Sequence, residues 1–133
     1  MDKYLRIDPS GEITWISIDR VPYSWDPGTL GPSLDQLYAA IGCSCIEQVR
    51  TVLPGVVLIV DECGRVKDPP QRHNELASRL YYGWLCGMDD IVGPAVVAAL
   101  RPTGPLGELD MFPLNGAELA KLSLYLGLEI PDK

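Results

Sequence analysis

Basic residues are scarce in this sequence, and long apolar runs are absent from it. Lys and Arg number 11 against 18 Asp and Glu in 133 residues, so the net charge is −7 with the single His neutral. A field of that sign repels nucleic-acid phosphates, so we expect no binding to DNA or RNA. No apolar run approaches the ~20 residues that a membrane span requires, and the N-terminal residues lack the apolar stretch of a signal peptide. We therefore expect a cytoplasmic protein that does not associate with membranes.

The sequence also lacks the common catalytic motifs. G-x-S-x-G, Walker A and G-x-G-x-x-G do not occur in it, so no glycine-rich phosphate cradle is predicted. The one histidine, His73, has no motif beside it that would supply a nucleophile. We therefore predict no catalytic residue and no cofactor.

The four cysteines do not form the pattern of a metal site. Cys43 and Cys45 would lie on the same side of a strand, but the second cysteine pair of a structural zinc site is missing. Free cysteines in a cytosolic protein are reduced and are often buried as small apolar residues. We therefore expect four buried thiols and no metal ion.

Two pairs of acidic residues flank predicted strands. Asp61-Glu62 follows an apolar run, and Asp89-Asp90 precedes the next one. Such carboxylates can hold Mg²⁺ or act as general acid and base, although acidic residues are also ordinary turn formers. Successive residues of a strand face opposite sides, so each pair offers one carboxylate to a site. A metal-dependent nucleotide-processing enzyme stays open as one alternative.

The patterns predict an α+β fold in a single domain over residues 1–133. We expect a mostly antiparallel sheet of about five strands with two to three helices packed on it. The predicted strands span residues 3–8 and 12–20 (an N-terminal hairpin over 3–20), 43–52, 56–60 and 90–100. The aliphatic run 56–60 is typical of a central strand that is buried on both faces. Asp61 to Gly64 is interpreted as the central turn of a β-meander, with Gly64 free to take a positive φ.

Capping residues mark the predicted helices, which span residues 34–41, 74–84 and 114–126. Ser33 and Asn74 are suitable N-caps, while Gly42 and Gly127 stop the first and last helix. Between the N-terminal hairpin and the first helix, residues 21–32 hold three prolines and two glycines, which predicts an irregular loop. The aromatic residues of this loop fit either a homo-oligomer interface or a folded-back lid.

A possible ligand platform surrounds the middle helix. Residues 71–84 combine two Arg, one His, one Asn and three large aromatic residues. Aromatic rings stack on bases, and Arg pairs with phosphate in a bidentate manner. The predicted ligand-binding residues are Glu47, Arg50, Arg72, His73, Asn74, Arg79, Tyr82 and Trp84. In this hypothesis the arginines hold phosphates, Tyr82 or Trp84 stacks on a base, and Glu47 or Asn74 contacts ribose or base edges. Core packing remains an alternative for Trp84, which has helical spacing with Leu80.

Four separated blocks carry a family resemblance: LDQLYAAIGCSCIE at 34–47, VLIVDECGRVK at 57–67, NELA at 74–77 and IVGPAV at 91–96. Together they resemble a small uncharacterised domain family of bacteriophages and of actinobacterial and firmicute mobile elements, over residues 33–98. The resemblance implies a phage-type accessory protein in the cytoplasm of a bacterial host. It carries no established catalytic residues. Glu47, Asp61, Glu62, Gly64 and Asn74 occupy the motif positions of that family.

These observations lead to a ranked set of functional expectations. The first is a non-enzymatic protein that binds and sequesters a small nucleotide-like host immune signal. The alternative is an acidic protein–protein interaction module that inhibits a host defence protein, because acidic domains can cover a basic surface.

Overall fold

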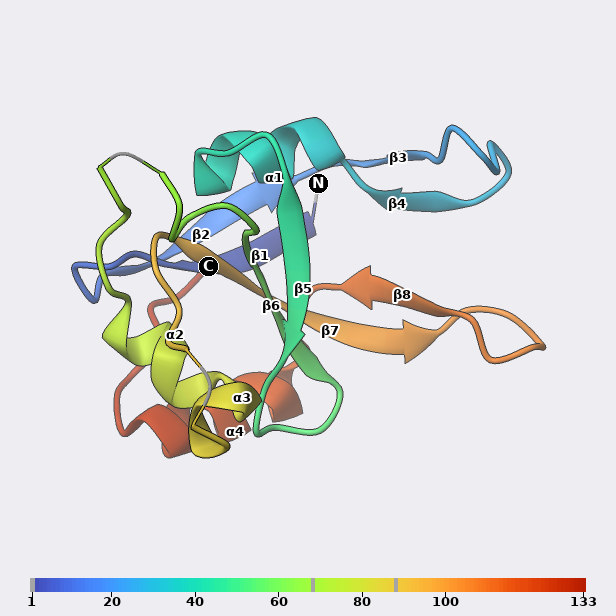
Figure 1. Ribbon diagram of the computed structural model, residues 1–133. Helices are drawn as coiled ribbons and strands as arrows, with labels where there is room; N and C mark the ends of the chain where they lie inside the picture. The colour runs from blue at the N-terminus through green and yellow to red at the C-terminus, as the bar shows by residue number, and fades with distance from the viewer. Residues whose placement is uncertain (1, 68, 88) are drawn as a thin grey trace.

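The computed structural model describes residues 2–67, 69–87 and 89–133. Its elements in chain order are β1 (Asp2–Ile7), β2 (Ile13–Ile18), β3 (Arg20–Pro22), β4 (Leu30–Pro32), α1 (Leu34–Ile41), β5 (Ile46–Arg50), β6 (Val56–Asp61), α2 (Glu75–Leu80), α3 (Tyr82–Leu85), β7 (Ala95–Pro102), β8 (Leu109–Phe112) and α4 (Gly116–Leu126) (Figure 1). None of the helices in the described residues is long and apolar enough to cross a bilayer.

The main sheet has six strands, and β7 lies at its centre. The strand order is β2-β1-β7-β6-β5, and β8 pairs with the far end of β7. All of these pairings are antiparallel. The register places Ala95 opposite Ile7 at the start of β7 and Pro102 opposite Leu109 at its end. The α+β fold with a mostly antiparallel sheet is thus confirmed, with one more strand in the sheet than expected.

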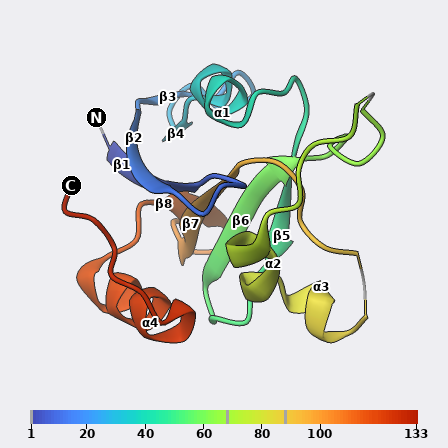
Figure 2. The same cartoon turned by 90° about the vertical axis from the view of Figure 1, so that its left-hand side faces the viewer.

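Helices cover both faces of the sheet (Figure 2). One core cluster includes Leu58 and Val60 of β6 and packs against α2 and α4. The other includes Val57 and Ile59 and packs against α1. Every residue of β6 is buried, which confirms the prediction of a central strand buried on both faces.

The predicted caps begin and end the helices as expected. Ser33 accepts a hydrogen bond from the backbone N–H of Gln36, and Gly42 ends α1 with φ 77°. Asn115 and Glu118 form a capping box at the start of α4, which Gly127 ends.

The middle helix is shorter than predicted, because it breaks at Tyr81. Tyr81 has an extended backbone (φ −66°, ψ 119°) that separates α2 from α3. This backbone pairs with the chain just after β5, since Tyr81 forms an isolated bridge with Thr51 and the Leu80 carbonyl accepts from the Val52 N–H. The break therefore exchanges helical hydrogen bonds for tertiary ones. Gly83 leaves room for the Tyr81 ring, which an added Cβ would approach to 2.5 Å.

The interpretation of residues 61–64 as a meander turn is wrong. Asp61 ends β6, and the chain then runs through α2 and α3 before it returns as the neighbouring strand β7. Gly64 does not take a positive φ. Its small size instead allows close packing, because a Cβ there would lie 3.0 Å from Cγ2 of Val92. The strand predicted over 90–100 begins only at Ala95, and the one predicted over 43–52 is confined to 46–50.

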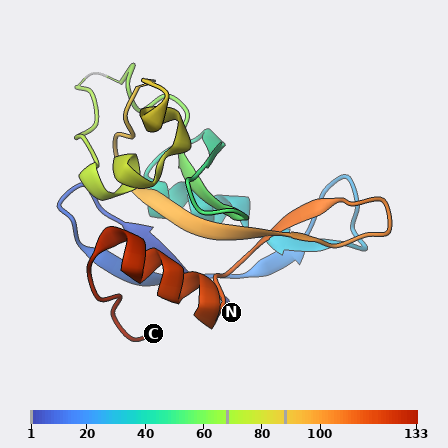
Figure 3. The same cartoon turned by 90° about the horizontal axis from the view of Figure 1, so that it is seen from below.

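Residues 21–32 are more ordered than the predicted irregular loop. Arg20, Val21 and Pro22 pair with Pro32, Gly31 and Leu30 in the two-stranded ribbon β3–β4. This ribbon and the end of the β7–β8 hairpin project from the same side of the molecule (Figures 1 and 3). The pairing of β8 with β7 was not expected from the sequence.

Candidate functional site

The predicted ligand residue Asn74 is fully buried. Its side-chain oxygen accepts from the backbone N–H of Ala77 at 3.1 Å and so caps α2. Its amide nitrogen donates to the carbonyl oxygens of Ile7 and Gly93, each at 2.9 Å. These bonds hold α2 to the first strand and to the segment before β7. The side chain is thus occupied within the fold, which favours the capping role over contact with a ligand.

His73 is held between two carboxylates. Its Nε2 lies 2.8 Å from Oε2 of Glu75, and its Nδ1 contacts Asp90. The hydrogen bond to Glu75, and after it the one to Asp90, raises the pKa of His73 above its ordinary value of 6.5. Asp90 also pairs with Arg65. The cluster joins the start and the end of the segment that contains α2 and α3. The positive charge of His73 is balanced there by carboxylates, without a phosphate.

We expect His73 to make the stability of the fold depend on pH. A raised pKa means that the folded state binds the proton more tightly than the unfolded state. The resulting stability is fully present below the unfolded pKa, near 6.5, and is lost as the pH rises through the folded pKa. Urea unfolding from about pH 5.5 to about pH 8.5 should show this loss in the parent and a flatter profile in His73→Gln. Identical profiles would contradict the assignment.

The arginines of the predicted platform do not converge with His73. Arg72 is exposed, and its backbone accepts a hydrogen bond from the Gly93 N–H. Arg79 lies on α2, where its carbonyl oxygen accepts from the Tyr125 hydroxyl at 2.9 Å. In the described residues neither arginine forms an ion pair. Their guanidinium groups therefore have no carboxylate partner in the described residues, and their role in holding phosphates stays a prediction.

Arg50 and Tyr82 do come together, at the outer edge of the sheet. The Arg50 guanidinium lies 5.3 Å from the centroid of the Tyr82 ring, a cation–π distance. A shallow and mostly apolar cavity of about 230 Å³ adjoins them, and Val49, Tyr81 and Gly83 complete its lining. Trp84 is exposed on the same short helix.

Glu47 is exposed on β5, at a cavity of only about 50 Å³. Glu62 and Asp90 also line this cavity, together with the buried Asp61. Asp61 is already engaged, since it accepts from Nε2 of Gln71 at 2.8 Å and pairs with Lys67. No group of three or more His, Cys, Asp or Glu side chains in the described residues is placed to hold a metal ion.

The cysteines differ from their expected burial. Cys45, Cys63 and Cys86 are exposed, and Cys43 is half-buried. Cys45 donates its S–H to Oε2 of Glu62 at 2.8 Å. This hydrogen bond raises the pKa of the Cys45 thiol to about 11, so the thiol stays protonated at neutral pH.

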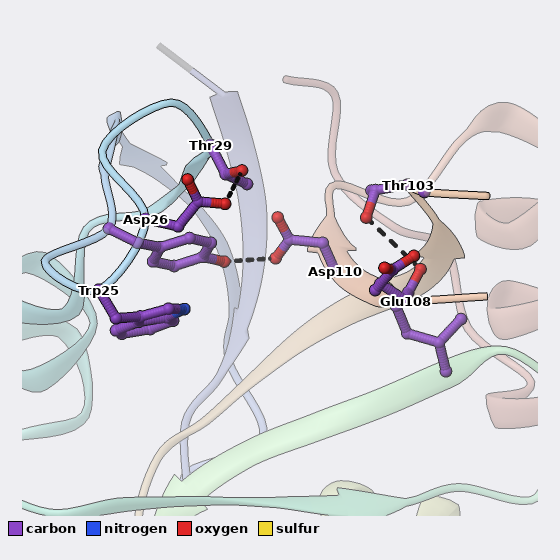
Figure 4. A pocket seen from close by; sticks show the side chains of 9 residues that line it. Trp25, Asp26, Thr29, Thr103, Glu108 and Asp110 are labelled. Atoms are coloured by element: carbon purple, nitrogen blue, oxygen red, sulfur yellow. Dashed lines mark hydrogen bonds between the residues drawn. The ribbon is translucent and has the colours of Figure 1, made fainter. Parts of the chain in front are cut away.

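A cavity lies between the two projecting hairpins, where no ligand site was predicted. We call it the inter-hairpin cleft. Its volume is about 360 Å³. Figure 4 shows Trp25, Asp26 and Thr29 of one hairpin facing residues of the other. The lining consists of Tyr23, Trp25, Asp26, Thr29, Thr103, Gly104, Glu108, Leu109 and Asp110.

A partly buried group of Arg20, Tyr23 and Asp110, called the clasp here, holds the two hairpins together. Asp110 of β8 accepts from the Tyr23 hydroxyl at 2.6 Å and from the Arg20 guanidinium at 3.4 Å. Arg20 also donates to the carbonyl oxygens of Met111 and Leu30, so it binds both hairpins at once. Burial, and then the Asp110 carboxylate, raise the pKa of Tyr23 to about 12, which keeps its hydroxyl a donor.

An aromatic stack forms one wall of the inter-hairpin cleft. The rings of Tyr23 and Trp25 are stacked, with centroids 4.4 Å apart and an interplanar angle of 15°. Gly31 makes this possible, because an added Cβ would lie 2.0 Å from the Tyr23 hydroxyl oxygen. Trp25 nevertheless remains 73% exposed. The two aromatic residues of the loop therefore differ. Tyr23 is folded back against β8, while Trp25 leaves an aromatic surface exposed.

The cleft lining carries three carboxylates and no Lys, Arg or His. Arg20, which is not part of the cleft lining, balances the charge of Asp110. Among the described residues Asp26 and Glu108 form no ion pair. Asp26 accepts from the Thr29 hydroxyl at 2.6 Å, and Glu108 accepts from the Leu106 N–H at 3.2 Å. These neutral bonds orient the two carboxylates and leave their negative charges uncompensated.

The sequence held one signal for this site. Two aromatic residues between prolines and glycines marked residues 21–32 as unusual, but their partner β8 was not predicted, so the cleft was not predicted either.

Comparison with known families matches residues 2–109 to DUF3846, a domain of unknown function. The chain belongs to the DUF3846 family.

The DUF3846 match extends beyond residues 33–98 in both directions. It takes in the β3–β4 ribbon and ends at Leu109, the first residue of β8. No curated protein and no solved structure matches the chain. The function must therefore be argued from the geometry of the site.

Proposed function

We propose that this chain is a protein-interaction module that binds a basic segment of a partner in the inter-hairpin cleft. The observation that carries the proposal is a cavity of about 360 Å³ whose only charged lining residues are acidic. Carboxylates around a concave surface concentrate negative potential, and the net charge of −7 extends the attraction over the whole molecule.

The cleft offers three kinds of contact to an ammonium or guanidinium group. Asp26 and Glu108 supply charges without protein counter-ions, each worth about 0.2–1 kcal/mol when exposed. The exposed ring of Trp25 can take a cation over its free face for about 0.5–1 kcal/mol. Hydroxyl groups of Thr29 and Thr103 add hydrogen-bond acceptors at the same walls.

This proposal develops the interaction-module alternative that the acidic sequence suggested. The family resemblance supports a phage or mobile-element setting. We propose that the partner in that setting is a host defence protein with a basic exposed segment, which the chain would inhibit by covering it.

Neutralising the cleft should weaken binding of a basic peptide. The double variant Asp26→Asn with Glu108→Gln removes both uncompensated charges, and we expect the Kd for a fluorescein-labelled Arg-rich peptide to rise about tenfold. The matched control is Glu12→Gln with Glu47→Gln, which changes the net charge equally at exposed positions outside the cleft. Equal losses in both variants, or no binding by the parent in low salt, would contradict the proposal.

A nucleotide-like ligand remains a second candidate, at the Arg50–Tyr82 pair. The supporting observation is the placement of a guanidinium over an exposed aromatic ring beside an apolar cavity of about 230 Å³. This pair would hold a phosphate and stack on a base, and the chain would sequester the ligand. A filtration assay with cyclic nucleotides and NAD-derived signals tests it, because retention should be lost in Tyr82→Ala. If all of these compounds remain free with the parent protein, the candidate fails.

A further inference from the structure

A second cavity lies on the other side of the aromatic stack from the inter-hairpin cleft. Its volume is about 210 Å³, and it lies between the β3–β4 ribbon and the start of α1. Tyr23 and Trp25 line both cavities, so the stacked pair is their common wall. The lining consists of Val21, Pro22, Tyr23, Ser24, Trp25, Pro32, Ser33, Leu34 and Asp35. We call this cavity the ribbon pocket.

The two cavities differ in chemical character. The ribbon pocket has apolar walls from Val21 and Leu34, which are 37% and 41% exposed, and from two prolines. Its only charged lining residue is Asp35, in the first turn of α1. An apolar side chain in this pocket would gain from burial against these walls.

We infer that the partner segment is amphipathic, with a basic side chain in the inter-hairpin cleft and an apolar side chain of the same short segment in the ribbon pocket. The inference rests on the proposed function and names the class of partner. The two cavities adjoin each other, because Tyr23 and Trp25 line both of them. Alternate side chains of an extended segment point to the same side about 7 Å apart, so one short segment can enter both cavities. Trp25 is then covered by the segment that crosses it.

The ribbon pocket also supplies the selectivity that charge alone lacks. Any polycation is attracted to a surface of net charge −7, so charge steers the encounter but discriminates weakly. With an apolar subsite next to the acidic cleft, a purely basic segment binds more weakly than an amphipathic one, because it leaves Leu34 and Val21 uncovered. The aromatic wall between the two sites has the character of a binding hot spot.

Three peptides of equal length test the inference. In a Ser background they place Arg and Leu, Arg and Ala, or Ser and Leu in turn at every second position, so that the two side chains lie on the same side of an extended segment. Their affinities are measured by calorimetry. We expect the Arg–Leu peptide to bind about tenfold more tightly than the Arg–Ala peptide, from burial of leucine side chains. The variant Leu34→Ser should abolish this preference. Val21→Ser should act in the same direction, and Leu124→Ser, an exposed position on α4, serves as the control.

The outcomes separate the two proposals. Equal affinities for the Arg–Leu and Arg–Ala peptides would overturn the amphipathic partner and leave the proposed function intact. If neither arginine peptide binds, the proposed function fails as well. Equal affinities for the Arg–Leu and Ser–Leu peptides would show an apolar groove without a need for basic residues, which overturns both. A preference that survives in Leu34→Ser and Val21→Ser would place the apolar contact elsewhere and overturn the inference.

Discussion

Replacement of Asn74 by alanine should lower the free energy of unfolding by about 3 kcal/mol or more. Loss of the helix cap costs about 1 kcal/mol. The carbonyl oxygens of Ile7 and Gly93 would also lose their buried donor, at about 1–3 kcal/mol each. Urea unfolding followed by far-UV circular dichroism measures the change, and a marginally stable domain would be substantially unfolded by it.

The matched control for this prediction is Asn115→Ala. Asn115 caps α4 through the same contact with a backbone N–H, but it is exposed and makes no tertiary hydrogen bond through its side-chain amide in the described residues. We expect a loss of about 1 kcal/mol. Equal losses at Asn74 and Asn115 would show that the buried amide bonds contribute little, contrary to the assignment.

Replacement of Asp110 by alanine should have the second largest effect, on stability and on binding together. Arg20 would lose its buried partner, and the Tyr23 hydroxyl would lose its acceptor. Because Arg20 keeps Asp2 and two carbonyl oxygens as partners, we expect a loss of about 2–3 kcal/mol, below the ~3–5 kcal/mol typical of a broken buried pair. The contact between the hairpins would be weakened, and the cleft would lose one of its three carboxylates. The variant should therefore bind a basic peptide at least tenfold more weakly, measured by fluorescence anisotropy.

Tyr23→Phe separates the clasp from the aromatic stack. It removes one hydrogen bond to Asp110, at about 1 kcal/mol, and retains the ring that stacks on Trp25. We expect peptide binding close to that of the parent. If Asp110→Ala also retained full peptide affinity, the inter-hairpin cleft would not be the binding site.

Local capping chemistry made much of the scaffold predictable. Ser33, Gly42 and Gly127 each satisfy helix ends with their neighbours in sequence, so their roles are visible without the tertiary structure. The aliphatic run of β6 likewise shows its burial on both faces through composition alone.

The unpredicted elements depend on partners far away in the chain. β3 and β4 have three residues each and contain prolines, so their pattern is too short to signal a strand. Tyr81 lies inside a helical pattern but leaves the helix, because its backbone is drawn into a bridge with Thr51. Tertiary hydrogen bonds override local helix propensity at this point.

The predicted ligand platform separated for a similar reason. Residues close in sequence around α2 have different surroundings. Asn74 is buried, His73 lies between carboxylates, and the backbone carbonyl of Arg79 accepts from Tyr125. The inter-hairpin cleft has the opposite property, since Asp26 and Glu108 come from hairpins distant in sequence. No local pattern joins them, and tertiary contacts of Asp110 and Arg20 bring them to one cavity.

The most direct test of the central claim is a nuclear magnetic resonance titration of the ¹⁵N-labelled protein with the Arg–Leu peptide. We predict chemical-shift changes at residues 21–35 and 103–110, including the indole N–H of Trp25, with little change at residues 47–50 and 82–85. Changes confined to the second of these regions, or no change at peptide concentrations in the millimolar range, would contradict a binding site between the two hairpins.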